Sequence, residues 1–211
     1  MNNELEIYCA AHSNDELPLL QDLTRQTFLN VLNPRMLSGH LQGLFLQMIV
    51  TMIHPKRVLE IGTFTGYSAL CIAQNLDSDA LLHTIEINDE VAHFAKDFFA
   101  KSDFASKIVS HVGDAAEIID RLDEMFQLVF IDANKRDYIG YYNSVFDKVD
   151  RGGFILADNV LWDGHVLDVD KCKNDAQTKG ISEFNKMIKN DSRVEKLMLP
   201  LRDGLFIIRK K

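Results

Sequence analysis

Short β-rich runs alternate with helical patterns along most of the chain after Pro55, and this alternation limits the folds that the chain can adopt. Two parallel neighbouring strands need a long crossover connection, which is usually a helix. Alternating strands and helices therefore build a parallel sheet, and right-handed crossovers place helices on both of its faces. We expect a doubly wound α/β fold. The β-rich runs are residues 57–61, 81–87, 108–112, 128–131 and 154–157, and the helices begin at Tyr67, Asp89, Ala115 and Tyr138.

The carboxyl-terminal part of the sequence departs from this pattern. A polar stretch over residues 164–180 leads to a helix at about residues 181–189, and two apolar runs follow at residues 194–199 and 205–208. Only residues 200–204 connect the two runs, and so short a connection makes paired strands antiparallel. The sequence therefore predicts a mostly parallel seven-stranded sheet with one antiparallel strand near its carboxyl terminus.

Two helical patterns precede the alternating part. Apolar positions recur at helical spacing over about residues 15–32, and a second apolar helix is predicted over residues 41–53. The chain has 211 residues, its glycines and prolines are dispersed, and no low-complexity stretch divides it. We therefore expect a single domain over residues 1–211, with N-terminal helices in residues 1–53 and an α/β core in residues 55–211.

The charge balance and the cysteines narrow the class of function. Acidic residues outnumber basic residues by 31 to 23, and the resulting net charge of −8 disfavours proteins that follow nucleic-acid phosphates. The amino terminus lacks the regions of a signal peptide, and Gln47 and Thr51 interrupt the most apolar stretch, so we expect no membrane span. Three widely spaced cysteines fit reduced thiols better than a disulfide framework. We expect a cytoplasmic protein.

The end of the first β-rich run is a candidate ligand site, because open parallel sheets bind ligands at the carboxyl ends of their strands. Glu60 lies near this end, and Gly62, Gly66 and Ser68 follow it. The glycines permit close approach of a ligand, and the next helix offers unpaired amide donors. Phe64 stands where a dinucleotide fingerprint requires glycine, which weakens a nicotinamide-binding interpretation. A tight turn with packing glycines is the structural alternative.

Two further strand ends carry acids. Glu86 ends the second run, and a carboxylate there can accept two hydrogen bonds from a ribose diol. Asp114 follows the third run, where it either accepts from an exocyclic amine or caps the next helix. Taken alone, Glu86 is compatible with a surface acid and Asp114 with a helix cap. Asn88 is a good N-cap for the helix that begins at Asp89.

The fourth and fifth runs end in candidate metal ligands. Asp132 follows the fourth run, with Lys135 three residues on, and Asp158 and Asn159 end the fifth. If the two strands are neighbours, three oxygen ligands converge, which suits a hard divalent cation such as Mg²⁺. A salt bridge between Lys135 and one aspartate, or turn-forming Asp and Asn, explains the same residues without a metal. Neither HExxH nor a paired CxxC motif occurs, so we expect no zinc site.

A series of motifs runs from about residue 34 to the carboxyl terminus: MLSGHLQGLFLQMI, PKRVLEIGTFTGYSA, HTIEIN, VGDA, FIDANKRDYIGYY, GGFILADNVLWDG and LPLRDG. A lone EIGxxxG would be a weak signal, whereas the ordered set is specific. It resembles the cation-dependent class I S-adenosylmethionine O-methyltransferases, the family of catechol and caffeoyl-coenzyme A O-methyltransferases and many bacterial relatives. The resemblance implies a Rossmann-like fold, S-adenosylmethionine as methyl donor and a homodimer.

The resemblance also implies the residues of the site. Asp132 would lie between the cofactor and a divalent cation such as Mg²⁺, with Asp158 and Asn159 as the other protein ligands. Lys135 matches the family's base. Asn134 stands where the family often has Asp, but this position is not one of the three ligands, so metal binding is left intact. The residues implied to bind the cofactor, from its methionine end to its adenine, are Met36, Ser38, Glu60, Gly62, Ser68, Glu86, Asp114 and Ala115.

Trp162 follows the predicted metal pair in the sequence. It would form an apolar wall for a flat substrate ring, or else pack in the core. The two readings of this single tryptophan are evenly balanced on the sequence alone.

The implied reaction is methyl transfer to a hydroxyl of a catechol-like small molecule, an aromatic vicinal diol. A phenol with a pKa of about 10 is mostly protonated at neutral pH and is a poor nucleophile. A cation that holds both oxygens would stabilise the phenolate, and Lys135 would accept the proton if its pKa is lowered. Two alternatives stay open: methylation of a hydroxylated tRNA base, which the acidic balance weakly disfavours, and cofactor binding without catalysis, which the presence of all candidate ligands and the base disfavours.

Overall fold

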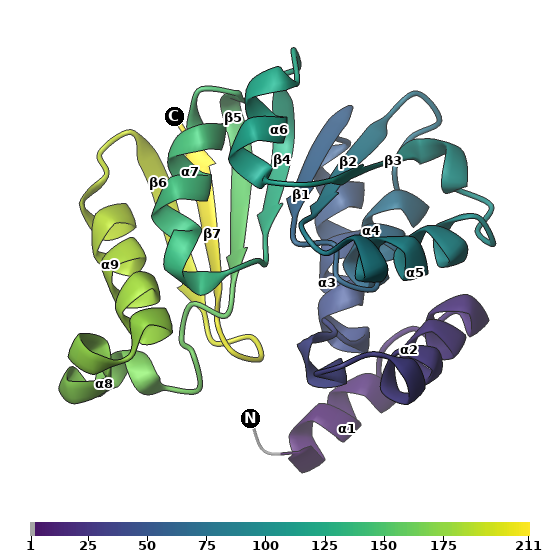
Figure 1. Cartoon of the computed structure of the whole chain (residues 1–211), viewed down its shortest axis with the longest axis horizontal. Coiled ribbons are helices and arrows are strands. Elements are labelled where there is room, and N and C mark those ends of the chain that lie inside the picture. Colours follow the sequence, from purple (N-terminus) through teal and green to yellow (C-terminus); the bar gives the residue numbers. More distant parts are fainter. Residues whose placement is uncertain (1–2) are drawn as a thin grey trace.

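Seven strands form one sheet in the computed structural model, which describes residues 3–211 (Figure 1). Their order across the sheet is β3-β2-β1-β4-β5-β7-β6. The first five strands pair in parallel, and β7 is antiparallel to both β5 and β6. This confirms the predicted mixed sheet. The strands are β1 (Arg57–Ile61), β2 (Leu81–Glu86), β3 (Ile108–Val112), β4 (Phe126–Ile131), β5 (Val149–Asp158), β6 (Val194–Leu199) and β7 (Leu205–Lys210).

Helices connect the strands, and polar side chains cap several of them. The Asn88 side chain accepts from the backbone N–H groups of Glu90 and Val91, as expected for an N-cap. The α-helices are α1 (Asn3–Ala11), α2 (Pro18–Asn30), α3 (His40–Ile53), α4 (Tyr67–Gln74), α5 (Asp89–Phe99), α6 (Ala115–Arg121), α7 (Tyr138–Phe146), α8 (Val169–Asn174) and α9 (Ala176–Asn190). Short 3₁₀ turns are η1 (Pro34–Met36), η2 (Ala105–Lys107), η3 (Lys135–Asp137) and η4 (His165–Leu167).

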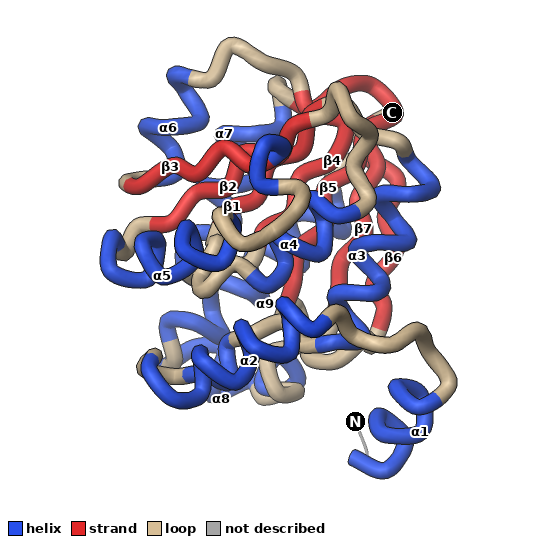
Figure 2. The backbone as a smooth tube through the Cα atoms, turned by 90° about the vertical axis from the view of Figure 1, so that its right-hand side faces the viewer, coloured by secondary structure: helices blue, strands red, loops and turns tan. Residues whose placement is uncertain are grey.

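The sheet separates two apolar cores, one on each face. Side chains alternate along a strand, so Leu59 and Ile61 of β1 lie in one core and Val58 in the other. Helices α6, α7 and α9 cover the first face, and α2, α3, α4 and α5 cover the second (Figures 1 and 2). Helices on both faces of the sheet are the predicted doubly wound arrangement.

The structure adds elements that the sequence pattern does not predict. Helix α8 lies inside the polar stretch, where the Asp168 side chain caps it by accepting from two backbone N–H groups. Helix α9 begins at Ala176, five residues before the predicted start, because the Asp175 side chain caps it by accepting from the backbone N–H and the hydroxyl of Thr178. Strand β5 begins at Val149, and its pairing with β4 is irregular near Phe126, beside the Gly152–Gly153 pair.

Helix α3 belongs to the only segment within residues 3–211 that is long and apolar enough to cross a membrane, judged by length and composition alone. This segment, Pro34–Ile53, has a mean hydropathy of 1.4. In the fold it consists of η1, a break at Gly39 and α3. Gln42 and Gln47 of α3 donate hydrogen bonds to side chains of β5 and α4 respectively. These two hydrogen bonds show that α3 packs against other parts of this chain.

Candidate active site

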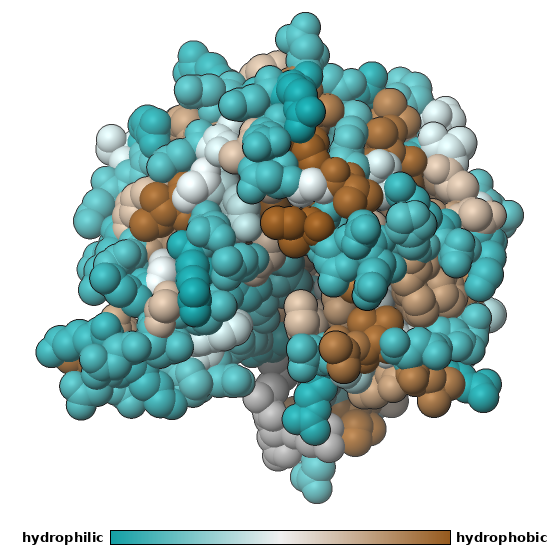
Figure 3. All heavy atoms as spheres, viewed as in Figure 1, coloured by the Kyte–Doolittle hydropathy of each residue, from teal (hydrophilic) through white to brown (hydrophobic). Residues whose placement is uncertain are grey.

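Acidic residues from four strands meet at one edge of the sheet. Glu60 is the penultimate residue of β1, Glu86 and Asp158 end β2 and β5, and Asp132 follows β4. The edge includes the neighbouring strands β1 and β4, where the strand order reverses and where open sheets bind ligands. In the view of Figure 1 these strand ends face downward, and the surface is hollowed in the lower centre, between the α8 side and the α2 side (Figure 3).

Glu60 is fully buried at this edge. The hydroxyl of Thr84 donates to its Oε2 atom, whereas Oε1 has no hydrogen-bond partner within the described part of the chain. Burial raises the pKa of Glu60 to about 8, the hydroxyls of Ser68 and Thr84 oppose the rise, and the carboxylates of Asp132 and Glu86 add to it. A buried acid with one unpartnered oxygen is suited to receive a cationic group.

The turn after β1 is shaped by close backbone contact. Gly62 has a φ of 101°, and a Cβ atom there would lie 2.0 Å from the carbonyl oxygen of Asp132. Only glycine therefore lets the ends of β1 and β4 approach this closely. Phe64 donates its backbone N–H to Oε2 of Glu86 at 2.8 Å, and Asn88 donates to Oε1 at 3.0 Å. Glu86 thus holds the turn in place, a role that its position at a strand end did not reveal.

Lys135 joins the strand ends of β4 and β5. Its Nζ atom donates to Oδ1 of Asp132 at 2.7 Å and to the hydroxyl of Tyr138 at 2.9 Å. That hydroxyl in turn donates to the backbone carbonyl of Asp158 at 2.9 Å. The salt bridge that the sequence left open is present, and Tyr138, which the sequence did not single out, connects the base candidate to a ligand candidate.

Lys135 is protonated in this arrangement, whereas a lysine that acts as a general base must be neutral. Burial favours its neutral form, but the carboxylate of Asp132 and the Tyr138 hydroxyl outweigh burial, so the pKa of Lys135 is raised above its ordinary value. A base role requires a lowered pKa. Lys135 is therefore a bound ammonium group in this arrangement, and its role as base stays a prediction.

Asp158 is buried and held from several directions. Its Oδ2 atom accepts from Nε2 of Gln42 at 2.7 Å, and its Oδ1 atom accepts from the backbone N–H of Asn159 at 2.8 Å. Burial and the charge of Asp132 raise the pKa of Asp158 to about 6. The neighbouring Asn159 has a φ of 55°, and no described residue forms a hydrogen bond with its side chain.

The remaining predicted residues lie around this cluster in different environments. Ser38 and Ser68 are buried, whereas 60% of Met36 is exposed. Asp114 caps α6 by accepting from the backbone N–H of Glu117 at 3.1 Å, and the adjacent Ala115 is buried. The cap is the role that the sequence favoured for Asp114 when taken alone.

Trp162 is half-buried, has a φ of 48°, and lies outside both apolar cores. A packing role in the core is therefore not observed for it. This leaves the substrate-wall interpretation as the prediction for this side chain.

The residues predicted to hold a metal are two carboxylates and one amide. Within residues 3–211, no three His, Cys, Asp or Glu side chains come together as metal ligands. Asp132 and Asp158 are nevertheless close enough for one charge to raise the pKa of the other group. Asn159 follows Asp158 directly and supplies an amide oxygen of the kind that hard cations accept.

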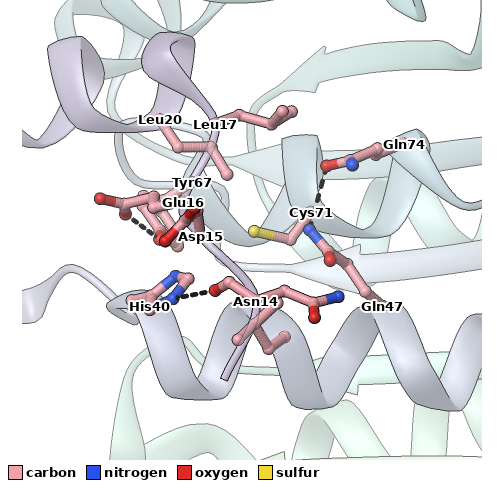
Figure 4. A pocket seen from close by; sticks show the side chains of 11 residues that line it. Asn14, Asp15, Glu16, Leu17, Leu20, His40, Gln47, Tyr67, Cys71 and Gln74 are labelled. Atoms are coloured by element: carbon pink, nitrogen blue, oxygen red, sulfur yellow. Dashed lines mark hydrogen bonds between the residues drawn. The ribbon is translucent and has the colours of Figure 1, made fainter. Parts of the chain in front are cut away.

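A separate small cavity lies between the α1–α2 connection, α3 and α4 (Figure 4). The Tyr67 hydroxyl donates to Glu16 there, and a ring nitrogen of His40 is 2.8 Å from the Asn14 carbonyl oxygen. Its volume of about 80 Å³ is well below the roughly 300 Å³ of small ligand sites. These contacts hold the α1–α2 connection against α3, through His40, and against α4, the helix that carries Ser68, through Tyr67.

Comparison with known proteins shows which family of proteins this chain belongs to. The sequence matches the O-methyltransferase family over residues 10–211. The chain belongs to this family. Caffeoyl-CoA O-methyltransferase 1 of Nicotiana tabacum is 34% identical to this O-methyltransferase over 183 residues, which cover 80% of this chain and 75% of the relative.

Two solved structures resemble the O-methyltransferase along nearly its whole length. One is the O-methyltransferase TomG from Streptomyces achromogenes, in complex with SAM, which is 28% identical with a TM-score of 0.92 and aligns over 99% of this chain and 96% of its own. The other is the SAH-bound methyltransferase PaMTH1 from Podospora anserina, which is 27% identical with a TM-score of 0.91 and aligns over 100% and 97%. These findings confirm the predicted class of S-adenosylmethionine-dependent O-methyltransferases.

Proposed function

We propose that this O-methyltransferase transfers the methyl group of S-adenosylmethionine to one hydroxyl of an aromatic vicinal diol, with a divalent cation such as Mg²⁺ at Asp132, Asp158 and Asn159. The observation that carries the proposal is the convergence of Glu60, Asp132 and Asp158 at one sheet edge, where burial and the charge of Asp132 raise the pKa of Glu60 and of Asp158. Such a cluster is stabilised by positive charge. The proposal supplies two positive groups, the cofactor's ammonium and the cation.

The residues at the end of β1 fit the aminocarboxyl portion of the cofactor. Oε1 of Glu60 is buried without a partner and would accept from the ammonium group. The first backbone N–H groups of α4, beside Ser68, would bind the carboxylate, since helix N-termini attract anions. Glu86 accepts one N–H on each oxygen, and each oxygen keeps a further lone pair for a ribose hydroxyl.

The residues at the ends of β4 and β5 fit a hard cation. Each carboxylate oxygen of Asp158 accepts one hydrogen bond and keeps a lone pair, and the Asn159 side chain is without a protein partner in the described residues. A bound divalent cation would act as a Lewis acid that favours the ionised form of the acceptor's phenol. Asp132, Asp158 and Asn159 would hold the cation. Its positive charge would favour the ionised form of Asp158, whose pKa is raised without it.

Lys135 is placed to handle the proton of the acceptor. Asp132 and Tyr138 fix the position of its Nζ atom, and only 7% of the residue is exposed. Nζ can accept the hydroxyl proton only after it has lost its own, and a second positive charge near Asp132 would weaken the interaction that raises its pKa. Lys135 would thus act by accepting the proton of the acceptor's hydroxyl group.

The similarity to named relatives supports an aromatic acceptor. Curated relatives that are about one-third identical are caffeoyl-CoA O-methyltransferases. The half-buried Trp162, outside both cores, would form an apolar wall for a flat ring.

The test is mass-spectrometric detection of methyl transfer from S-adenosylmethionine to a panel of aromatic vicinal diols in the presence of Mg²⁺. Matched monohydroxy compounds with the same ring substituents are the controls. We expect monomethylated products from diols and none from the controls. Equal transfer to both sets would contradict an acceptor held through two oxygens, and transfer only to tRNA would move the proposal to a nucleic-acid acceptor.

A further inference from the structure

Arg202 connects two parts of the site that lie far apart in the sequence. It stands in the short connection between β6 and β7, which lies beside the start of α3 (Figure 1). Its Nη1 atom donates to the carbonyl oxygen of Ser38 and, at 2.6 Å, to Oε1 of Gln42. Its Nη2 atom donates to the carbonyl oxygen of Leu37 at 3.2 Å. One half-buried guanidinium thus binds both the segment before α3 and the first turn of that helix.

Gln42 transmits this contact to Asp158. The residue is 1% exposed, and its amide uses both ends: Oε1 accepts from Arg202, and Nε2 donates to Oδ2 of Asp158 at 2.7 Å. A guanidinium only donates and a carboxylate only accepts. The opposite orientation of the amide would face its NH₂ group to the guanidinium and its oxygen to the carboxylate. Arg202 therefore fixes the orientation in which Gln42 donates to Asp158.

We propose that Arg202 and Gln42 are positioning residues that hold Asp158 ready for the cation and couple it to the cofactor segment at Ser38. This inference rests on the proposed cation site. Neither residue needs to touch the cation, because Gln42 acts on Oδ2 of Asp158 and leaves a lone pair on that oxygen. Arg202 touches the backbone at Ser38, so a shift of that segment on cofactor binding would reach Asp158 through the side chains of Arg202 and Gln42.

The same α-helix supplies a matched control. Gln47 lies five residues after Gln42 on α3, and its Nε2 atom also donates to a side-chain oxygen, that of Gln74 at 3.0 Å. This pair lines the small cavity of Figure 4 and does not contact the acidic cluster. Replacing either glutamine by methionine removes a hydrogen bond of the same kind from the same helix. Only Gln42→Met removes it from Asp158.

The experiment measures Mn²⁺ binding to the full chain by electron paramagnetic resonance, first without cofactor and then with S-adenosylhomocysteine. Wild type, Gln42→Met, Arg202→Met and Gln47→Met are compared after their cooperative unfolding is verified. Loss of an outer partner of a metal ligand weakens metal binding by about 10–100-fold, so we expect at least about a tenfold loss in Gln42→Met. We expect a smaller loss in Arg202→Met and none in Gln47→Met.

A second readout separates positioning from a general loss of packing. In wild type, Mn²⁺ and S-adenosylhomocysteine should change each other's affinity by the same factor, as linkage requires. In Arg202→Met, this factor should fall toward one while each ligand still binds.

Gln42→Met binding Mn²⁺ as tightly as Gln47→Met would overturn the inference and leave the proposed cation site standing. Absence of Mn²⁺ binding by the wild type would contradict the cation site, and the inference with it. If Gln42→Met does not fold, Arg202→Met decides, because its side chain is only half-buried.

Discussion

Replacing Glu60 by glutamine should stabilise the folded chain at and above neutral pH while weakening cofactor binding. Burial raises the pKa of Glu60 from 4.5 to about 8. Since the folded pKa lies above the unfolded pKa, the contribution of Glu60 to stability is fully present below about pH 4.5. It falls as the pH rises and is lost above about pH 8. Glutamine does not ionise, so the variant should not show this loss.

The magnitude follows from the size of the shift. Each pKa unit corresponds to about 1.4 kcal/mol, so complete ionisation of the buried carboxyl costs the folded state at most about 5 kcal/mol. From about pH 5 to about pH 8, the stability difference between Glu60→Gln and wild type should grow by about 3.5 kcal/mol. The change with pH is the informative quantity, because any fixed cost of the buried amide is the same at each pH.

The assay is urea unfolding of both proteins without cofactor at several pH values in this range. A stability difference that stays constant from pH 5 to pH 8 would refute the raised pKa. On the ligand side, calorimetry with S-adenosylhomocysteine in buffers of different ionisation enthalpy should show proton release by wild type at neutral pH, because the ammonium group favours ionised Glu60. Glu60→Gln should bind more weakly and release no such proton.

Other substitutions test separate parts of the site. Lys135→Met should keep its affinity for S-adenosylhomocysteine in calorimetry while turnover falls by about 100-fold or more, and unchanged turnover would remove the base role. Gly62→Ala should lower the free energy of unfolding by about 2–4 kcal/mol, because its Cβ would lie 2.0 Å from the Asp132 carbonyl oxygen. Gly164→Ala also has a positive φ but no atom within 4 Å, so in urea unfolding it should cost about 1 kcal/mol, and an equal cost would contradict the close-contact argument. Asp158→Asn should abolish Mn²⁺ binding measured by paramagnetic resonance, and retained binding would place the cation elsewhere.

Much of the fold could be predicted because local patterns determine it. The predicted bounds of β1 and β3 agree with the structure residue for residue, since both runs are short and a glycine follows each of them directly. The start of β5 could not be predicted, because Asp150, Arg151 and two glycines lack strand character and stand at a register shift, where only the flanking Val149 and Phe154 pair with β4. Helix α8 has six residues and is mostly polar, so no apolar periodicity marks it.

The site could be predicted from the ends of strands, but its supporting contacts could not. Gln42 lies in an apolar helical pattern, and its partner Asp158 is 116 residues away, so no local signal connects them. Tyr138 is equally inconspicuous at the start of a helix, although it joins Lys135 to the Asp158 carbonyl. The pKa of Lys135 likewise depends on the three-dimensional placement of Asp132, which spacing alone does not give.

We propose that Asp132, Asp158 and Asn159, at the ends of β4 and β5, hold a cation that methyl transfer requires. The most direct test of this proposal follows the rate of transfer from S-adenosylmethionine to one aromatic diol while a chelator is added and then titrated with excess Mg²⁺. We expect that transfer stops with the chelator and resumes with Mg²⁺ in the wild type, and that Asp158→Asn does not recover. Transfer that continues at full rate in the chelator would contradict a role for the cation in the reaction.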